Sequence, residues 1–347
     1  MEKSQFNSFA DIAANGRKVK ETFFNQINTL IDWRPIEQFI RKHYKPGNDA
    51  VGRPSYSGLI LFKITLLQTW YNLSDYEVED QVNDRISFSR FVGLSMGESV
   101  PDHSVISRFR TAMTKTKAYD KLLNKINKQL SKHNILVHTG VIVDASITDS
   151  PRKPKGKKEY EIVEDRKEDE VETTPSLQQK FASNVDTDGG WTKKRNQLRY
   201  GYKQHTAVDP NGLVVAVTTT AANESDTKNL KGVLDKIKLL KGATVEADKG
   251  YKSKDNDELL REKFVKNRIM RKAVRNKPLT FREGLLNKAI SRTRYKVERT
   301  FGGIKRWFGG GVARYVGIEK MHTQHLMQAI AYNLYRSPGI VMSKCLN

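Results

Sequence analysis

Three carboxylic acids, each on or next to a predicted strand or helix, have the chemistry to bind divalent metal ions together. Asp144 follows the apolar run at 141–143, Asp248 follows a predicted strand at 243–247, and Glu298 lies on a long predicted helix. Carboxylate oxygens suit hard cations such as Mg²⁺, with Mn²⁺ as a substitute, and without His or Cys they disfavour zinc. Two such ions clamp the attacking and leaving oxygens when a phosphodiester is cut. If the acids converge, the pattern predicts phosphodiester chemistry.

The third acid has basic neighbours along the edge of its helix. Ser291, Arg294, Glu298 and Lys305 fall within about 40–60° of arc at 100° per residue. Beside them runs an apolar stripe formed by Ile290, Val297, Phe301, Ile304 and Phe308. This pattern predicts a helix that buries one face and presents a carboxylate between two cations. An ordinary pair between Arg294 and Glu298, at i and i+4, would explain the same spacing.

A mixed α/β sheet is predicted to position these acids. Strands are expected at 141–143, 200–209, 213–219, 243–247 and 264–270, and helices at 225–240, 254–263 and 285–308. Asp209-Pro-Asn-Gly212 predicts a hairpin turn between the second and third strands. Crossover helices then join the later strands, which makes the sheet mixed. Sites gather at the carboxyl ends of strands, so Asp144 and Asp248 converge if the first and fourth strands are neighbours.

The region before this sheet, residues 1–135, is predicted to be helical. The segment 57–67 is apolar enough to be a buried helix, and Ser74 with Glu77 matches a capping box. A further helix is expected to start at 101–104 and to carry Arg108 and Arg110. Short helices joined by tight turns are compatible with a helix-turn-helix DNA reader. A helical scaffold or dimerisation region is an equally good interpretation.

The rest of the chain is predicted to form a catalytic domain over 136–335, followed by a tail at 336–347. A charged insertion is expected at about 150–198. Within it, the stretch 159–172 holds eight acids and two bases, which is typical of an exposed loop.

The charge of the chain predicts a polyanionic partner. Over 347 residues the formal net charge is +22, and the stretch 261–314 alone holds 17 Lys and Arg against 3 Asp and Glu. Nucleic acid is the commonest partner of such a protein. Two groups of side chains are candidate DNA contacts: Arg299 and Arg306, by charge and position, and Lys203 and His205, which alternate onto one face of the second strand.

The sequence also argues against several other classes of protein. The sequence contains no run of 18 apolar residues, so it predicts no membrane span, and no secretory signal is visible. The single cysteine, Cys345, excludes an internal disulfide and a cysteine-based zinc site. We therefore expect an intracellular protein in a reducing compartment.

A spaced set of motifs resembles the DDE transposases of the insertion sequence family five type. The motifs are 141–146 (Val-Ile-Val-Asp-Ala-Ser), 200–209, 247–251 (Ala-Asp-Lys-Gly-Tyr), 294–305 and, in the helical region, 101–110, and the resemblance covers roughly 50–335. It implies a ribonuclease H-like catalytic domain whose metal-binding acids are Asp144, Asp248 and Glu298. The family signature of Tyr, two residues, Arg, three, Glu, six, Lys is matched by Arg294, Glu298 and Lys305. Ser291 stands at the tyrosine position, which puts one expected contact with transposon-end DNA in doubt.

The resemblance implies an enzyme that binds the terminal inverted repeats of its own insertion sequence. It would cut phosphodiester bonds with Mg²⁺ and join the freed 3′-hydroxyl to target DNA. It would act on double-stranded DNA as a homodimer, in the cytoplasm on nucleoid DNA. Two alternatives stay open: a catalytically inactive, sequence-specific DNA-binding repressor, and a structure-specific, metal-dependent nuclease.

Overall fold

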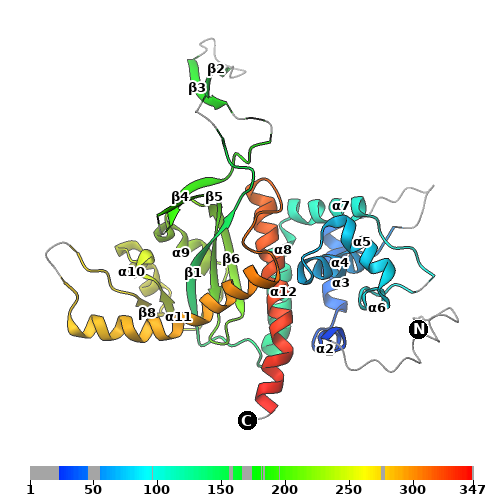
Figure 1. Cartoon of the computed structure of the whole chain (residues 1–347). Helices are drawn as coiled ribbons and strands as arrows, with labels where there is room; N and C mark the ends of the chain where they lie inside the picture. The colour runs from blue at the N-terminus through cyan, green and yellow to red at the C-terminus, as the bar shows by residue number, and fades with distance from the viewer. Residues whose placement is uncertain are drawn as a thin grey trace.

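A six-stranded mixed sheet lies beside a group of helices in the computed structural model of the chain (Figure 1). The structure describes residues 23–45, 55–95, 97–155, 159–165, 174–180, 182, 184–194, 196–274 and 278–345. The strands of this sheet are β1 (Gly140–Asp149), β4 (Gly190–Lys194), β5 (Gln197–Val208), β6 (Val214–Ala221), β7 (Thr244–Ala247) and β8 (Lys266–Ile269).

The strand order follows from two hairpins and two crossovers. β5 pairs antiparallel with β1, β4 and β6, whereas β1 with β7 and β7 with β8 are parallel pairs. The predicted turn at 209–212 joins β5 to β6, and Gly212 has a φ of 81°, a conformation that favours glycine. All five predicted strands are present, and the first and fourth, β1 and β7, are neighbours, which is the condition for Asp144 and Asp248 to converge.

The expectation of a five-stranded sheet with a charged loop at about 150–198 was wrong. This insertion supplies the sixth strand, β4, and a separate antiparallel pair, β2 (Glu159–Asp165) with β3 (Thr174–Lys180). Figure 1 shows β2 and β3 projecting away from the sheet. The acidic block therefore begins as a strand. Lys193 and Lys194 are exposed on β4 at the edge of the sheet, where strands commonly carry lysines, so a charged composition concealed a strand.

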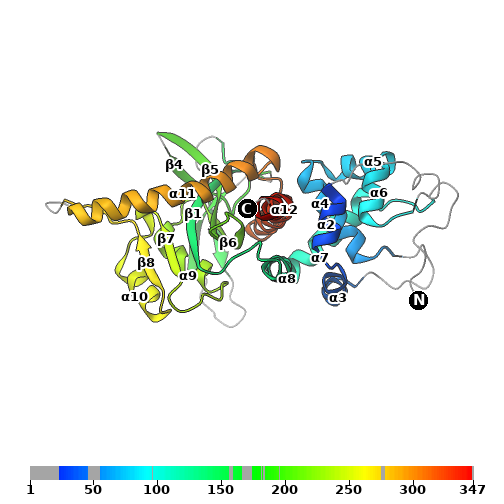
Figure 2. The same cartoon turned by 90° about the horizontal axis from the view of Figure 1, so that it is seen from below.

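Helices cover both faces of the sheet. Figure 2 shows the sheet between α11 (Phe281–Trp307) on one side and α9 (Asp226–Leu234) with α10 (Lys254–Glu262) on the other. The apolar stripe predicted for α11 is buried. This helix begins a turn earlier than expected, because Thr280 and Glu283 form a capping box there. α9 ends at Leu234, six residues before its predicted end at 240.

The described residues before 136 are helical, as predicted. The helices are α2 (Phe23–Leu30), α3 (Arg34–His43), α4 (Gly58–Trp70), α5 (Asp75–Asp84), α6 (Ile86–Val92), α7 (His103–Lys115) and α8 (Ala118–Lys132). The predicted buried helix is α4, the predicted capping box of Ser74 and Glu77 opens α5, and Asp102 caps α7. Residues 1–22 and 46–54 of the expected helical region lie outside the described residues.

The last helix, α12 (Ile318–Cys345), was not predicted. It lies between the sheet and the N-terminal helices and contacts β6, α8, α4 and α2 (Figure 1). Residues 336–345, expected as a tail, continue this helix. Asn333 fixes its position, because its side chain accepts from the Val214 amide at 2.7 Å and donates to the Val214 carbonyl at 2.7 Å and to Asn127 at 2.8 Å. Neither α12 nor any other helix that the structure describes combines the length and the apolar character needed to span a membrane.

Candidate active site

Two of the three predicted acids lie side by side because of the register between β1 and β7. Val143 is paired with Ala247 across this parallel ladder, so the next residues, Asp144 and Asp248, are adjacent. Asp144 lies within β1 and not at its end, because β1 continues its pairing with β5 as far as Asp149. It does follow the last residue of β1 that pairs with β7. The convergence expected of strand ends is thus retained.

The guanidinium of Arg294 on α11 lies among all three acids, which we call the carboxylate triad (Asp144, Asp248 and Glu298). Its Nη2 donates to Asp144 Oδ2 at 2.7 Å and lies 3.8 Å from Glu298 Oε1, while its Nη1 lies 3.3 Å from Asp248 Oδ1. The Arg294 side chain is 17% exposed, whereas that of Glu298 is 62% exposed. The acids from β1, from the turn after β7 and from α11 therefore converge on a single positive charge.

Burial and the ion pair act on the pKa of Asp144 in opposite directions. Burial raises this pKa above its ordinary value, although the charge and hydrogen bond of Arg294 and the amide of Ala145 lower it. Burial also lowers the pKa of Arg294, but the charge and hydrogen bond of Asp144, together with the charges of Asp248 and Glu298, leave it above its ordinary value. A carboxylate that is partly desolvated in this way is stabilised by any added positive charge.

The turn that carries Asp248 is held by neighbouring side chains. Asp248 caps the short helix η1 (Lys249–Tyr251) by accepting from the Lys249 amide at 2.7 Å. Asn256 donates to the carbonyls of Tyr251, at 2.7 Å, and Thr227, at 2.9 Å, and the Thr227 hydroxyl donates to Gly250 at 2.9 Å. Our sequence reasoning missed these positioning residues. Asn256 follows the predicted start of α10 and carries no distinguishing signal of its own.

A buried glutamate ties α11 to β7. Glu246, two residues before Asp248, is 6% exposed, accepts from the Thr293 hydroxyl and lies 3.1 Å from Arg268 Nη1. Thr293 precedes Arg294 on α11, so this contact fixes the helix next to the triad. A glutamate in the middle of an otherwise apolar strand was the one signal in the sequence that pointed to it.

The donor chemistry of the triad fits a hard divalent cation, because all three groups offer carboxylate oxygens. Among the residues that the structure describes, no group of three or more His, Cys, Asp or Glu side chains is already arranged to hold a metal. The charge that the triad shares is instead the Arg294 guanidinium. The three acids thus converge on a cation, but the cation is an arginine.

Comparison with protein families identifies the chain. A family model described as "Transposase DDE domain" matches residues 135–334, which is more than half of the sequence, and a "Transposase domain (DUF772)" model matches residues 13–112. The chain belongs to the DDE transposase family. This transposase is 36% identical over 234 residues to the transposase for insertion sequence element IS1106 of Neisseria meningitidis serogroup B. That alignment covers 66% of the present chain and 76% of its relative.

Among solved structures, the transposase is similar to the piggyBac transposase in a cryo-EM structure of its synaptic complex with hairpin DNA. The similarity covers 95% of the present chain and 78% of that chain, with a TM-score of 0.46 and 10% sequence identity.

Two residues of β5 that we predicted to approach DNA face the interior. His205 is fully buried, and its ring nitrogens hydrogen-bond with the hydroxyls of Tyr251 and Thr220, each at 3.1 Å. The Nζ of Lys203 lies 2.9 Å from Asp226 Oδ1 and donates to the Glu224 carbonyl at 2.6 Å. They do share one face of the strand, as predicted. Since α9 packs on that face, these contacts give no support to DNA binding by either residue, which stays a prediction.

Two buried histidines make the stability of the transposase depend on pH. Burial lowers the pKa of His205 to about 4, with Asp226 raising it and Lys203 lowering it further. Burial, and to a smaller extent the charge of His322, lowers the pKa of His325 to about 3. Both rings stay neutral in the folded protein, whereas the unfolded chain takes up protons below its own histidine pKa of about 6.5. This contribution to stability is therefore complete above pH 6.5 and is lost as the pH falls toward the folded values.

As the pH falls from about 6 to about 4.5, we expect each ring to lower the free energy of unfolding by about 1.4 kcal/mol per pH unit. Denaturant unfolding at pH 7, 6 and 5 measures this slope, and the comparison is with His325→Gln, which keeps a polar side chain beside Thr148 and Thr219. A variant with the same slope as the wild type would show that His325 does not cause the effect.

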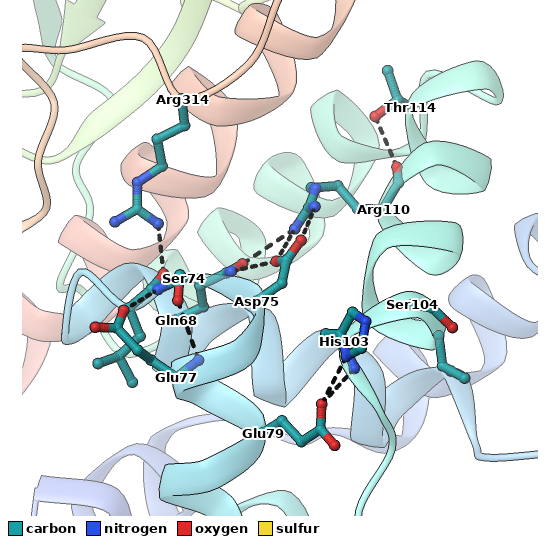
Figure 3. Close-up of polar contacts among 12 residues, drawn as sticks. Gln68, Ser74, Asp75, Glu77, Glu79, His103, Ser104, Arg110, Thr114 and Arg314 are labelled. Carbon is teal, nitrogen blue, oxygen red and sulfur yellow. Dashed lines mark hydrogen bonds and ion pairs between the residues drawn. The ribbon is translucent and has the colours of Figure 1, made fainter.

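The two arginines predicted on α7 have different environments. Arg110 is 12% exposed and forms a bidentate pair with Asp75, at 2.7 and 2.9 Å (Figure 3). Its guanidinium also lies 4.6 Å from the centre of the Tyr315 ring. Arg110 therefore joins α7 to α5 and to the loop before α12; these contacts give no support to a role in DNA binding, which stays a prediction. Arg108 is exposed on the same helix, and its role in DNA binding stays a prediction.

The remaining predicted DNA contacts lie on α11. Arg299 and Arg306 are exposed, and Ser291, at the family's tyrosine position, is exposed as well. Burial, then the charges of Arg199 and Lys194, lower the pKa of Lys305. Three cations from α11, β5 and β4 thus gather in one place.

Proposed function

We propose that this transposase binds the terminal inverted repeats of its insertion sequence, cuts phosphodiester bonds there and joins the freed 3′-hydroxyls to target DNA. The observation that carries the proposal is the convergence of Asp144, Asp248 and Glu298 from three separate elements on one positive charge. An ion pair on a helix surface needs one carboxylate. Three carboxylates at one point in a chain of net charge +22 point to catalysis on a polyanion.

The triad would hold the metal ions, with Mg²⁺ as the natural cation and Mn²⁺ as a substitute. Metal ions held by these carboxylates supply charge stabilisation for the attacking and leaving oxygens of an in-line displacement. Asp144 and Asp248, being adjacent, would hold these ions together, and Glu298 would help to hold one of them. In cleavage, an oxygen of water forms a bond to phosphorus while the bond to the 3′-oxygen breaks. In joining, the oxygen of the freed 3′-hydroxyl forms a bond to a phosphorus of the target DNA while the bond from that phosphorus to the target's own 3′-oxygen breaks, and the 3′-oxygen leaves with the proton.

The basic side chains of α11 would hold the DNA backbone. Arg294 and Lys305 flank Glu298 on the same helix edge, so phosphates bound there would lie next to the triad. The exposed Arg299 and Arg306 would extend this surface along α11, and Arg108 would contribute from α7. Guanidinium groups match phosphate oxygens in a bidentate geometry, which favours arginine in these positions.

We further propose that the sheet is a ribonuclease H-like catalytic fold. Its strands run in the spatial order β6, β5, β1, β7 and β8, with the first three antiparallel and the last two parallel to β1. We propose residues 136–335 as the catalytic domain and residues 1–135 as a DNA-binding or dimerisation region. A homodimer would bring two transposon ends together on nucleoid DNA in the cytoplasm.

A cleavage and joining assay tests the proposed function directly. The full-length protein is incubated with Mg²⁺, a duplex carrying the terminal repeats that flank the gene, and a supercoiled target plasmid. We expect nicking at the repeat end and covalent joining of the end to the plasmid, both lost when the metal is chelated. Nicking without joining would favour the nuclease. Tight binding with no nicking, in Mg²⁺ or Mn²⁺, would favour the repressor.

A further inference from the structure

We propose that Arg294 is an internal cation that keeps divalent metal out of the triad until DNA binds. DNA phosphate would draw the guanidinium away from the carboxylates, and the vacated space would then accept metal. This inference rests on the proposed function of the triad, and it adds an order of events: the metal site is completed by the DNA substrate.

The positions of the guanidinium nitrogens carry the first step. Nη2 lies 2.7 Å from Asp144 and 3.8 Å from Glu298, and Nη1 lies 3.3 Å from Asp248. The guanidinium thus fills the region on which the triad converges. Mg²⁺ needs its oxygen ligands at about 2.0–2.1 Å from a single centre. The acids cannot reach that distance to a shared ion while the arginine lies between them.

Charge makes the competition strong. The triad and Arg294 together carry three negative charges and one positive charge. An arginine in a protein does not give up its proton, so its charge cannot be removed to make room for a metal. A divalent ion placed a few ångströms from the guanidinium would be repelled by it, and this repulsion grows where water is excluded. Because the Arg294 side chain is 17% exposed, screening by solvent is limited.

The hold on Arg294 is nevertheless incomplete, which permits its release. Among the described residues its buried Nε has no hydrogen-bond partner, and Nη1 has only Met270 Sδ at 4.0 Å and the longer contact with Asp248. The pair with Glu298 is long, and Glu298 is mostly exposed, so it adds little. Asp144 is the principal anchor. A phosphate offers the guanidinium a bidentate partner in exchange for this one close carboxylate.

Binding of DNA and binding of metal should then reinforce each other. A ligand that removes Arg294 from the triad raises the affinity for metal, and by linkage metal raises the affinity for that ligand by the same factor. The stretch 261–314, which contains α11, carries a net charge of +14 by the count of 17 bases and 3 acids, so DNA is attracted to this region.

Titration with Mn²⁺ alone, followed by the electron paramagnetic resonance signal of the free ion, tests the proposal without any measurement of activity. The full-length wild type is compared with Arg294→Gln and with Arg294→Lys, which keeps the charge. Arg292→Gln is the matched control, because Arg292 is exposed on the same helix. This substitution removes the same charge at a position outside the triad. Asp144→Asn combined with Arg294→Gln shows whether the bound ion is at the triad.

Without DNA, we expect Arg294→Gln to bind Mn²⁺ about tenfold or more tightly than the wild type, within the usual range of coupling between sites. Arg292→Gln should bind as the wild type does, and Arg294→Lys should remain weaker than Arg294→Gln. A duplex carrying the terminal repeat should tighten Mn²⁺ binding to the wild type by a similar factor, and to Arg294→Gln much less. The Asp144→Asn double variant should lose the tight site.

Equal Mn²⁺ affinity of the wild type and Arg294→Gln without DNA would overturn this inference and leave the metal-binding triad in place. Weaker binding by Arg294→Gln would also overturn it, provided that the circular dichroism spectrum of the variant matches that of the wild type. If the variant is misfolded, the effect of DNA on the wild type decides, since unchanged Mn²⁺ affinity with DNA contradicts the inference. Failure of every protein to bind Mn²⁺, with or without DNA, would overturn the proposed function as well.

Discussion

Asp248→Asn is expected to lower the rate of strand cleavage by about a thousandfold or more, while binding to the terminal repeats stays within a few fold of the wild type. The substitution keeps the shape of the side chain and its cap on the Lys249 amide, but it removes the negative charge that a metal ion requires. Loss of a metal ligand forfeits several kcal/mol of transition-state stabilisation, and each 1.4 kcal/mol is about a factor of ten. Asp144→Asn and Glu298→Gln should behave in the same way.

The measurement is a cleavage assay on end-labelled repeat DNA, with a gel-shift assay for binding on the same samples. Asp235→Asn is the matched control, because it also removes one carboxylate, here from a surface pair with Lys231 and Lys263. It should cut at the wild-type rate. Cleavage by Glu298→Gln at the wild-type rate would remove Glu298 from the triad, even if both aspartates proved essential.

Arg110→Met is expected to lower the free energy of unfolding by about 3–5 kcal/mol, because it leaves the carboxylate of Asp75 partly buried without its partner. Arg110 lowers the pKa of Asp75 through its hydrogen bond and charge, although burial raises it, so the pair is closely interdependent. Urea unfolding of the variant at neutral pH measures the loss. Arg108 is exposed on the same helix and has no such ion pair among the described residues. Arg108→Met should therefore change the free energy of unfolding by less than about 0.5 kcal/mol.

The effects of the two substitutions on DNA binding should be the reverse of their effects on stability. If Arg108 contacts phosphate, Arg108→Met weakens DNA binding and reduces its salt dependence, while Arg110→Met changes DNA binding only when the protein unfolds. A double variant, Arg110→Met with Asp75→Leu, should recover much of the lost stability, since an apolar pair can replace a buried ion pair. Full stability of the single variant Arg110→Met would show that the pair contributes nothing.

Local signals explain which parts of the fold could be predicted from the sequence. The turn at 209–212, the capping box of Ser74 and the apolar run before Asp144 are each encoded by a short stretch of sequence. Each of them formed as expected. β4 and α12 were missed because their evidence is tertiary. β4 is a short edge strand whose lysines resemble a loop, and α12 is buried over much of its surface, so it lacks the one-sided pattern of a surface helix.

The same distinction applies to the candidate site. Spacing was enough to select the three acids as candidates, but it left the adjacency of β1 and β7, on which the convergence of Asp144 and Asp248 depends, as a condition. It could not tell an arginine that is free to meet DNA from one with a partner far away in the sequence. Arg110 meets Asp75 from another helix, and Lys203 meets Asp226 from α9. Alternation on a strand correctly placed Lys203 and His205 on one face, but which face a helix covers is decided by the topology.

The position of α12 has a consequence for biosynthesis. This helix is made after every element that it contacts, and it supplies buried side chains such as Leu326, Ile330 and Leu334 to the sheet and to α4 and α8. Until the ribosome has released it, β6 and the N-terminal helices keep their apolar faces exposed. Contacts so distant in sequence form slowly, and chaperones act on such exposed surfaces. A nascent chain stalled before residue 318 should therefore be unable to complete its core.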